Sequence, residues 1–163
     1  MKFIRFSLLL VCVLSGLFGC SKQGNPEGRL DVSGSVTFNG NSFGGPGSYN
    51  ITFEPVDDPS AGPSRASIDP TTSRYKCTMH DGLKPGKYLV KLTAMAEYDK
   101  RTHKPIDPEY ALTADIPEGV KISYYVSLLP PDFNETTAIE FEAVKGKKNA
   151  FDYNIETSYV PKP

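Results

Sequence analysis

Hydrophobic and polar residues alternate with a period of two along much of the chain after residue 29. The clearest example is the stretch 30–38, where Leu30, Val32, Val36 and Phe38 share one face and mostly polar residues occupy the other. Such alternation predicts a β-strand with one buried and one solvent-exposed face. The same kind of pattern recurs at 49–54, 66–68, 75–79, 87–94, 120–128, 139–143 and 151–155. We therefore expect about seven or eight strands.

Turn-forming residues separate these stretches and indicate how they connect. Asn39-Gly40-Asn41 accepts the positive φ angles that a tight hairpin turn requires. The stretches 139–143 and 151–155, joined by the basic turn 145–148, are expected to form a closing hairpin. The stretch 87–94 is partly apolar on both faces, so we expect it to be a central strand.

The predicted fold class is all-β. We expect a single β-sandwich of antiparallel strands over residues 30–157, followed by a short tail at 158–163. The 14 glycines and 14 prolines of the chain disfavour long helices and separate short strands. The segment from Tyr98 to Pro117 is charged and rich in proline. We expect a surface excursion between strands there, the alternative being a functional loop or lid.

The first nineteen residues carry a different pattern. Lys2 and Arg5 precede a nearly continuous apolar run from Phe6 to Phe18, and Gly19 and Cys20 follow it. The run is shorter than the roughly 18 to 20 residues that cross a bilayer, and a small residue precedes the expected cleavage site. Residues 1–19 are therefore interpreted as a cleaved export leader.

The end of the leader, Leu17-Phe18-Gly19-Cys20, resembles the bacterial lipobox. The resemblance implies that Cys20 receives a diacylglyceryl group and becomes the mature N-terminus, which makes it the lipid attachment residue. Phe18 departs from the small residue usual at its position, and the alternative is an ordinary signal peptide with an incidental cysteine. Two or three acyl chains would give a lasting membrane anchor. Residues 20–29 are polar and are expected to form a flexible tether.

The cysteines and the charge agree with an exported domain. Of three cysteines, Cys12 leaves with the leader and Cys20 carries lipid, so Cys77 remains without a disulfide partner. Alternation places Cys77 on the apolar face of its strand, as a buried, inert thiol. Loss of Lys2 and Arg5 changes the formal charge from −1 to −3. This balance gives no indication of nucleic-acid binding.

Several short motifs then resemble a known family. They are Val32-Ser33-Gly34-Ser35-Val36-Thr37, Ile51-Thr52-Phe53-Glu54-Pro55, Leu83-Lys84-Pro85-Gly86-Lys87-Tyr88 and Leu129-Pro130-Pro131-Asp132-Phe133-Asn134. Together they are similar to the carboxypeptidase-regulatory-like or transthyretin-like (prealbumin-like, Ig-like) β-sandwich, especially in small lipoproteins of planctomycete bacteria. Asp132 and Phe133 depart from the family pattern, in which a basic residue and a tyrosine are usual. The resemblance implies a domain without catalysis of its own.

Candidate chemistry is sparse. No motif for a nucleophile, a zinc site or a phosphate-binding loop is present, and no catalytic, cofactor-binding or metal-binding residue is assigned. His80, next to Asp81, and His103 are the only histidines and are interpreted as surface residues. Three loop acids, Asp57, Asp58 and Asp69, are expected at one end of the sandwich and are candidate calcium ligands. The pair Tyr124-Tyr125 should expose one ring, which is able to stack on sugars.

These observations favour a non-enzymatic, lipid-anchored protein of the bacterial cell envelope, on the periplasmic face or the cell surface. Its expected partners are the membrane, through Cys20, and an envelope protein or glycan. The alternative is a glycan- or calcium-binding module that uses loops at one end of the sandwich. An enzyme is the least favoured reading, because neither histidine lies in a recognisable catalytic pattern.

Overall fold

The computed structural model describes residues 28–106 and 122–161, and this part of the chain is all-β. It contains the strands β1 (Val32–Phe38), β2 (Ser48–Pro55), β3 (Ser64–Ser67), β4 (Arg74–Cys77), β5 (Gly86–Asp99), β6 (Ser123–Ser127), β7 (Glu140–Ala143), β8 (Asn149–Ala150) and β9 (Tyr153–Ile155). Three short 3-10 helices, η1 (Pro59–Ala61), η2 (Met79–Asp81) and η3 (Pro131–Phe133), lie between strands. Within the described ranges, no helix is long and apolar enough to cross a membrane.

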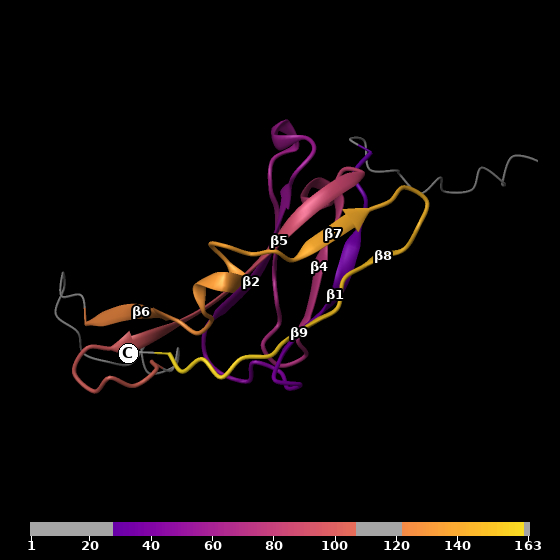
Figure 1. Cartoon of the computed structure of the whole chain (residues 1–163). Coiled ribbons are helices and arrows are strands. Elements are labelled where there is room, and N and C mark those ends of the chain that lie inside the picture. Colours follow the sequence, from indigo (N-terminus) through magenta and orange to yellow (C-terminus); the bar gives the residue numbers. More distant parts are fainter. Residues whose placement is uncertain (1–27, 107–121, 162–163) are drawn as a thin grey trace, which may run out of the picture.

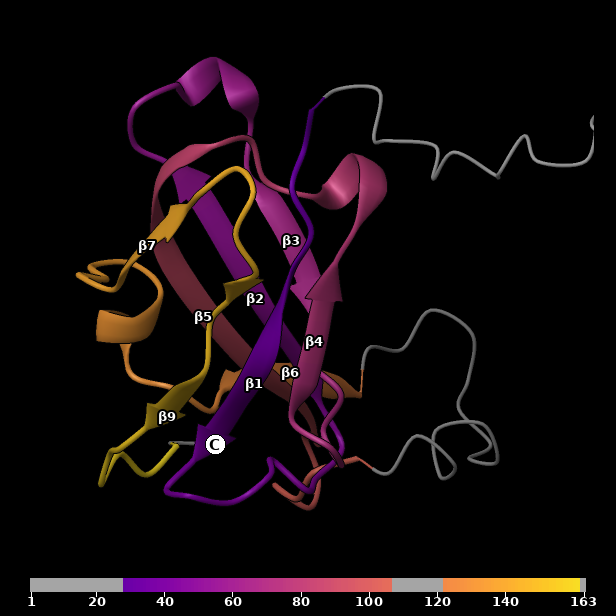
Figure 2. The same ribbon diagram turned by 90° about the vertical axis from the view of Figure 1, so that its right-hand side faces the viewer.

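The strands form two sheets that pack against each other in a sandwich-like arrangement. In the first sheet β1 is central, with β4 on one side and β8 followed by β9 on the other. In the second sheet the order is β3-β2-β5-β6, and β7 also pairs with β5. Figure 2 shows β1 and β4 in front of β2 and β5. The all-β prediction is thus confirmed for the part of the chain that the structure describes.

The strand β5 organises the second sheet, as its apolar character on both faces predicts. It pairs along most of its length with β2, from Tyr88 with Pro55 to Met95 with Ser48. Its other edge is shared by two strands, β7 over residues 86–89 and β6 over residues 95–99. The prediction that this strand is central is confirmed, although its observed length of 14 residues exceeds the predicted stretch.

The core lies between the sheets and is built around Phe53. Its ring centroid is 6.1 Å from that of Tyr75 and 6.2 Å from that of Phe151, both in or next to the first sheet. Within its own sheet it is 6.4 Å from Tyr88 and 5.5 Å from Phe141. Predicted inward residues that are buried include Val32, Val36, Tyr49, Ile51, Ile68, Cys77, Val90, Leu92, Ala94, Val126, Ala143 and Ile155. One aromatic residue therefore joins the two layers.

The connections differ from the prediction at both expected hairpins. Asn39 and Gly40 do adopt positive φ, and Phe38 and Asn41 exchange backbone hydrogen bonds. However, β1 and β2 belong to different sheets, so this tight turn begins a crossover. The expected closing hairpin is also wrong, because β7 pairs with β5 whereas β8 and β9 pair with β1. Local turn chemistry sets the reversal of the chain but not the sheet that the next strand joins.

The strand orientation also corrects the expectation of a purely antiparallel fold. Both β8 and β9 run parallel to β1, whereas the other ladders between the described strands are antiparallel. The last predicted strand, 151–155, is observed as β9, and the short β8 before it was not predicted; it brings the number of strands in the described ranges to nine. The break between β8 and β9 falls at Phe151 and Asp152.

Part of the charged segment after residue 98 is ordered as an extension of the second sheet. We call β6 and residues 96–106 the arm, and Figure 1 shows it extending away from β1 and β4. Tyr98 bridges Pro105, and the amide of Ile106 donates to the carbonyl of Glu97. The predicted surface excursion therefore starts too early in the sequence, because Tyr98 and Asp99 still belong to β5. The rest of the segment, from residue 107, lies outside the described residues, as do Val120 and Lys121 of the predicted strand 120–128.

Candidate functional site

A groove with a volume of about 1040 Å³ opens on the described surface. It is lined by residues of β1, β4 and β8, by the start of β2 and by the turn between β3 and β4. The central strand β1 contributes only small residues there, Ser33, Gly34 and Ser35. Long side chains of the neighbouring strands rise beside them, so the alternation of β1 and β4 itself produces the hollow.

Three exposed cations surround this groove: Arg74 and Lys76 on β4, and Lys148 immediately before β8. On β4 they alternate with the buried Tyr75 and Cys77, and the register places Lys76 opposite Ser33 and Arg74 opposite Ser35. None of the three cations forms an ion pair with another described residue. We call this hollow and its three basic residues the cationic groove.

Two carboxylates also line the cationic groove, and both are engaged with the backbone. Asp152 accepts hydrogen bonds from the backbone amide and the hydroxyl of Ser35, each at 2.8 Å. Asp69 accepts from the amides of Thr72 and Thr71, at 2.7 and 2.9 Å, and these bonds hold the pKa of Asp69 below its usual value. The two acids therefore stabilise the walls of the groove, and neither forms an ion pair with its three cations.

Next to the groove, β1 closely approaches the break between β8 and β9. The hydroxyl of Tyr75 donates to the carbonyl of Phe151 at 2.9 Å. A Cβ atom on Gly34 would lie 1.8 Å from that same carbonyl oxygen, so only glycine fits. Burial raises the pKa of the Tyr75 hydroxyl well above its usual value, so it remains a hydrogen-bond donor. This arrangement places Asp152 beside Ser35.

The three candidate calcium ligands do not come together. Asp57 and Asp58 follow the end of β2 at Pro55, whereas Asp69 lies near the start of β2, where the amide of Ile68 donates to the carbonyl of Tyr49. An eight-residue strand separates the two positions by about 20 Å. The expectation that these acids share one end of the sandwich is wrong. In the described ranges, no group of three or more potential metal ligands is found.

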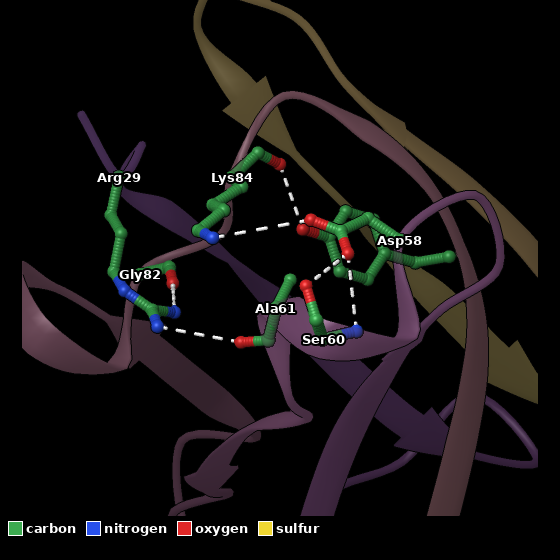
Figure 3. A network of polar contacts seen from close by, with 7 residues as sticks. Arg29, Asp58, Ser60, Ala61, Gly82 and Lys84 are labelled. Atoms are coloured by element: carbon green, nitrogen blue, oxygen red, sulfur yellow. Dashed lines mark hydrogen bonds and ion pairs between the residues drawn. The ribbon is translucent and has the colours of Figure 1, made fainter. Parts of the chain in front are cut away.

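Asp58 has a structural role at its own end of the molecule (Figure 3). Asp58 is the N-cap of η1. Its carboxylate accepts hydrogen bonds from the amide and hydroxyl of Ser60 and lies 4.0 Å from the amino group of Lys84. The hydrogen bonds from Ser60, followed by the nearby Lys84, hold the pKa of Asp58 below its usual value. Tyr88 donates to the carbonyl of Lys84 at 2.8 Å. These contacts join the β2–β3 loop to the start of β5.

Arg29 fixes the chain where the described part begins. Its guanidinium donates to the carbonyl of Gly82 at 2.9 Å and to that of Ala61 at 3.4 Å (Figure 3). The next residue, Leu30, exchanges backbone hydrogen bonds with Leu83. The chain is therefore attached to the sheets from Arg29 onward. Cys20, the predicted lipid attachment residue, lies outside the described residues.

The two histidines occupy separate surface positions. His80 is exposed in η2 beside the exposed Asp81. His103 lies in the arm, where its Nδ1 is 3.1 Å from the hydroxyl of Tyr124. As the alternation predicts, the neighbouring Tyr125 is turned outward, with 67% of its surface exposed. Neither histidine is among the residues that line the cationic groove.

Cys77 is buried, with 1% of its surface exposed, and is a free thiol. Burial, reinforced by the negative charge of Asp81, raises its pKa to about 11. The thiolate, which is the reactive form, is therefore disfavoured at neutral pH. The interpretation of Cys77 as a buried core residue is confirmed.

The sequence interpretation did not identify the cationic groove. Arg74 and Lys76 were visible as outward positions between Tyr75 and Cys77, but an isolated pair of surface cations indicates no site. Lys148 and Asp152 join them only because β8 lies beside β1, which the expected closing hairpin did not allow. No family model matches this sequence, and no curated protein and no solved structure shows significant similarity to it.

Proposed function

We propose that this chain is a non-enzymatic, lipid-anchored protein of the bacterial cell envelope, and that its two-sheet domain is an interaction module of the Ig-like or transthyretin-like type. The lipid is attached to Cys20 after cleavage of the leader 1–19. The leader pattern and Leu17-Phe18-Gly19-Cys20 support the anchor. Two sheets packed over a shared core support the sandwich type.

The attachment of Arg29 to the sheets is the observation that carries this proposal. Arg29 follows Cys20 by nine residues. Nine residues span at most about 30 Å when fully extended, so a lipid on Cys20 would keep the domain close to the membrane surface. Such a position suits a module that contacts other envelope components, because it restricts the search for a partner to a thin layer.

The anchor is tested by expressing the chain in bacteria with labelled palmitate and determining the mass of its mature N-terminal peptide. We expect a labelled protein that begins at an acylated Cys20 and enters the detergent phase on Triton X-114 partitioning. The variant Cys20→Ala should carry no label and move to the aqueous phase. Cys12→Ala, a matched change inside the leader, should behave as the wild type. A native protein that begins at Met1, or a Cys20→Ala variant that still enters the detergent phase, would contradict the proposal.

The non-enzymatic part has its own test. A hydrolase screen on the purified protein should show no turnover above that of an unrelated protein. Activity that disappears in His80→Ala or His103→Ala would overturn this part of the proposal, because these are the only histidines of the chain and histidine is the most common general acid or base in enzymes.

The cationic groove favours one of the alternative functions, a glycan-binding module. A polar groove of about 1040 Å³ has the size of a ligand site. The calcium alternative loses its proposed ligand set, because Asp69 lies at the opposite end of β2 from Asp57 and Asp58.

A further inference from the structure

We propose that the cationic groove binds an acidic oligosaccharide, whose carboxylate or sulfate groups contact Arg74, Lys76 and Lys148. The hydroxyl groups of the sugar would then face the serines of β1. This inference rests on the proposed role as an interaction module and names the chemical class of its ligand. It does not depend on the lipid at Cys20.

The spacing of the cations fits a chain of acidic sugars. Arg74 and Lys76 are two residues apart on one face of β4, so their positions are separated by about 7 Å along the strand. Lys148 approaches from the far side of β1, about 10 Å across the sheet from β4. The three cations therefore lie on both sides of a groove whose middle is occupied by Ser33 and Ser35. A ligand with repeated negative groups is able to contact both sides at once.

The charge of the groove differs from that of the molecule. Three cations and two carboxylates line it, which gives a net positive charge, whereas the whole chain has a formal charge of −1. The cations have no ion-pair partner among the described residues, so an anionic ligand does not need to displace one. Of the two acids, Asp152 already accepts two hydrogen bonds at Oδ1. Its other oxygen is suited to accept a hydrogen bond from a sugar hydroxyl.

The side chains of the groove favour a sugar over a peptide. Peptide-binding grooves hold apolar or aromatic anchor residues in pockets. The outward positions of β1 and β4 are instead polar: Ser33, Ser35, Thr37, Arg74 and Lys76.

The same surface favours an acidic sugar over a neutral one. Neutral sugars are usually held by stacking on an exposed aromatic ring. The aromatic residues that line the groove, Tyr49 and Tyr75, are only 3% and 4% exposed and offer no free ring face. Recognition must therefore come from charge and hydrogen bonds, which an acidic oligosaccharide supplies.

The experiment is a calorimetric titration of the full-length protein in a nonionic detergent at low salt. The probes are an octasaccharide of polygalacturonate, a heparin octasaccharide, neutral maltooctaose and octaglutamate. We expect binding of at least one acidic sugar, weaker binding of octaglutamate, and none of maltooctaose. The affinity should fall as salt is added, because exposed charges are screened.

Variants locate the binding. Replacement of Arg74, Lys76 or Lys148 by Gln should each lower the affinity about two- to fivefold, and the triple variant at least about tenfold. The matched control replaces three exposed lysines outside the groove, Lys87, Lys100 and Lys104, by Gln, and should bind as the wild type. Ser33→Gln fills the middle of the groove without a change in charge and should also weaken binding. Equal melting temperatures would show that the variants are folded.

Each contrary outcome has a definite meaning. Equal losses in the groove triple variant and in the control triple variant would show unspecific attraction and overturn the inference. Absence of binding to both acidic sugars would also overturn it. Octaglutamate binding as tightly as the sugars would assign the groove to an acidic peptide instead. None of these results bears on acylation. If Cys20 is acylated but no sugar binds, the sugar-binding inference is wrong and the lipid-anchor proposal is unaffected.

Discussion

At the scale of single residues, burial decides which reactive groups remain available. Cys77 is the free thiol of the described chain, and its position among core residues removes it from solvent. Asp99 is the opposite case, a carboxylate only 4% exposed that is kept charged by its neighbours. Arg101 donates to it from its guanidinium and its backbone amide, and Thr102 donates from its amide. These bonds lower the pKa of Asp99 to about 2.

The thiol of Cys77 should react slowly in the folded protein. With a pKa raised to about 11 and almost no exposed surface, it should react with a disulfide reagent at pH 8 at least about a hundredfold more slowly than a free cysteine. The measurement is the absorbance change on addition of the reagent, with and without denaturant. One thiol should appear on unfolding of the acylated protein. A fast reaction in the native state would show that the region around β4 opens.

The carboxylate of Asp99 should make the arm sensitive to acid. Its pKa is lowered in the folded state, so its contribution to stability is present above the unfolded-state value of about 4. This contribution is lost as the pH falls through about 2. Asp99→Ala should remove that dependence and speed amide exchange at His103 and Ile106 on the order of tenfold, because the amide of His103 lies in the turn that Asp99 holds and that of Ile106 bonds to Glu97 just beyond it.

A matched variant separates this effect from a general loss of charge. Asp132→Ala, in the exposed η3, should leave the exchange of His103 and Ile106 unchanged. Unchanged exchange in Asp99→Ala as well would contradict a role of this carboxylate in the arm.

At the scale of elements, the path of β1 depends on the contact between Gly34 and the break that separates β8 from β9. The carbonyl of Phe151 occupies the space that a side chain at position 34 would need. It receives the hydrogen bond from Tyr75, while Asp152 binds the amide of Ser35. At the break, the backbone amide of Phe151 still donates to the carbonyl of Ser33, and the two side-chain hydrogen bonds supplement this bond before β9 pairs with the end of β1.

The variant Gly34→Ala should destabilise the protein strongly. Its Cβ would lie 1.8 Å from a backbone oxygen, so β1 or the break has to move, at a cost of about 2 to 4 kcal/mol. Chemical denaturation measures this free energy of unfolding. Gly45→Ala is the matched control, because its nearest neighbour would be at 3.7 Å and its change should be within about 0.5 kcal/mol. Equal stability of the two variants would show that the break is not held at this place.

At the scale of the whole molecule, the aromatic cluster around Phe53 makes the two sheets one folding unit. Its partners come from both layers, and Phe53 itself is fully buried. Tyr75 belongs to the first sheet and Phe141 to the second. A change at Phe53 is therefore felt in both sheets.

Phe53→Ala should lower the free energy of unfolding by about 3 to 5 kcal/mol, since it leaves a cavity between the layers. Both sheets should still unfold in a single transition, which circular dichroism and tyrosine fluorescence should report at the same midpoint. Tyr125→Ala removes an exposed ring and should change the stability by less than about 0.5 kcal/mol. Separate midpoints in the wild type would contradict a shared core.

The strand positions were largely predictable because they follow from local alternation. A residue such as Val32 or Ile51 faces inward whichever strand lies beside it, since the apolar face of a strand has to be buried. The turn at Asn39 and Gly40 was equally local, because positive φ is a property of those residues. For the same reason, the exposure of Tyr125 and the burial of Cys77 were predictable.

The sequence by itself determined an all-β chain, the phase of its main strands and the identity of its inward residues. Only the tertiary structure decided which strands are neighbours: that β7 joins β5, that β8 and β9 run parallel to β1, and that Asp69 lies far from Asp57. The physical reason is that alternation acts over adjacent residues, whereas strand pairing depends on packing between segments that are far apart in the sequence. The cationic groove depends on strand pairing, because Lys148 lies near Arg74 and Lys76 only when β8 and β4 flank β1.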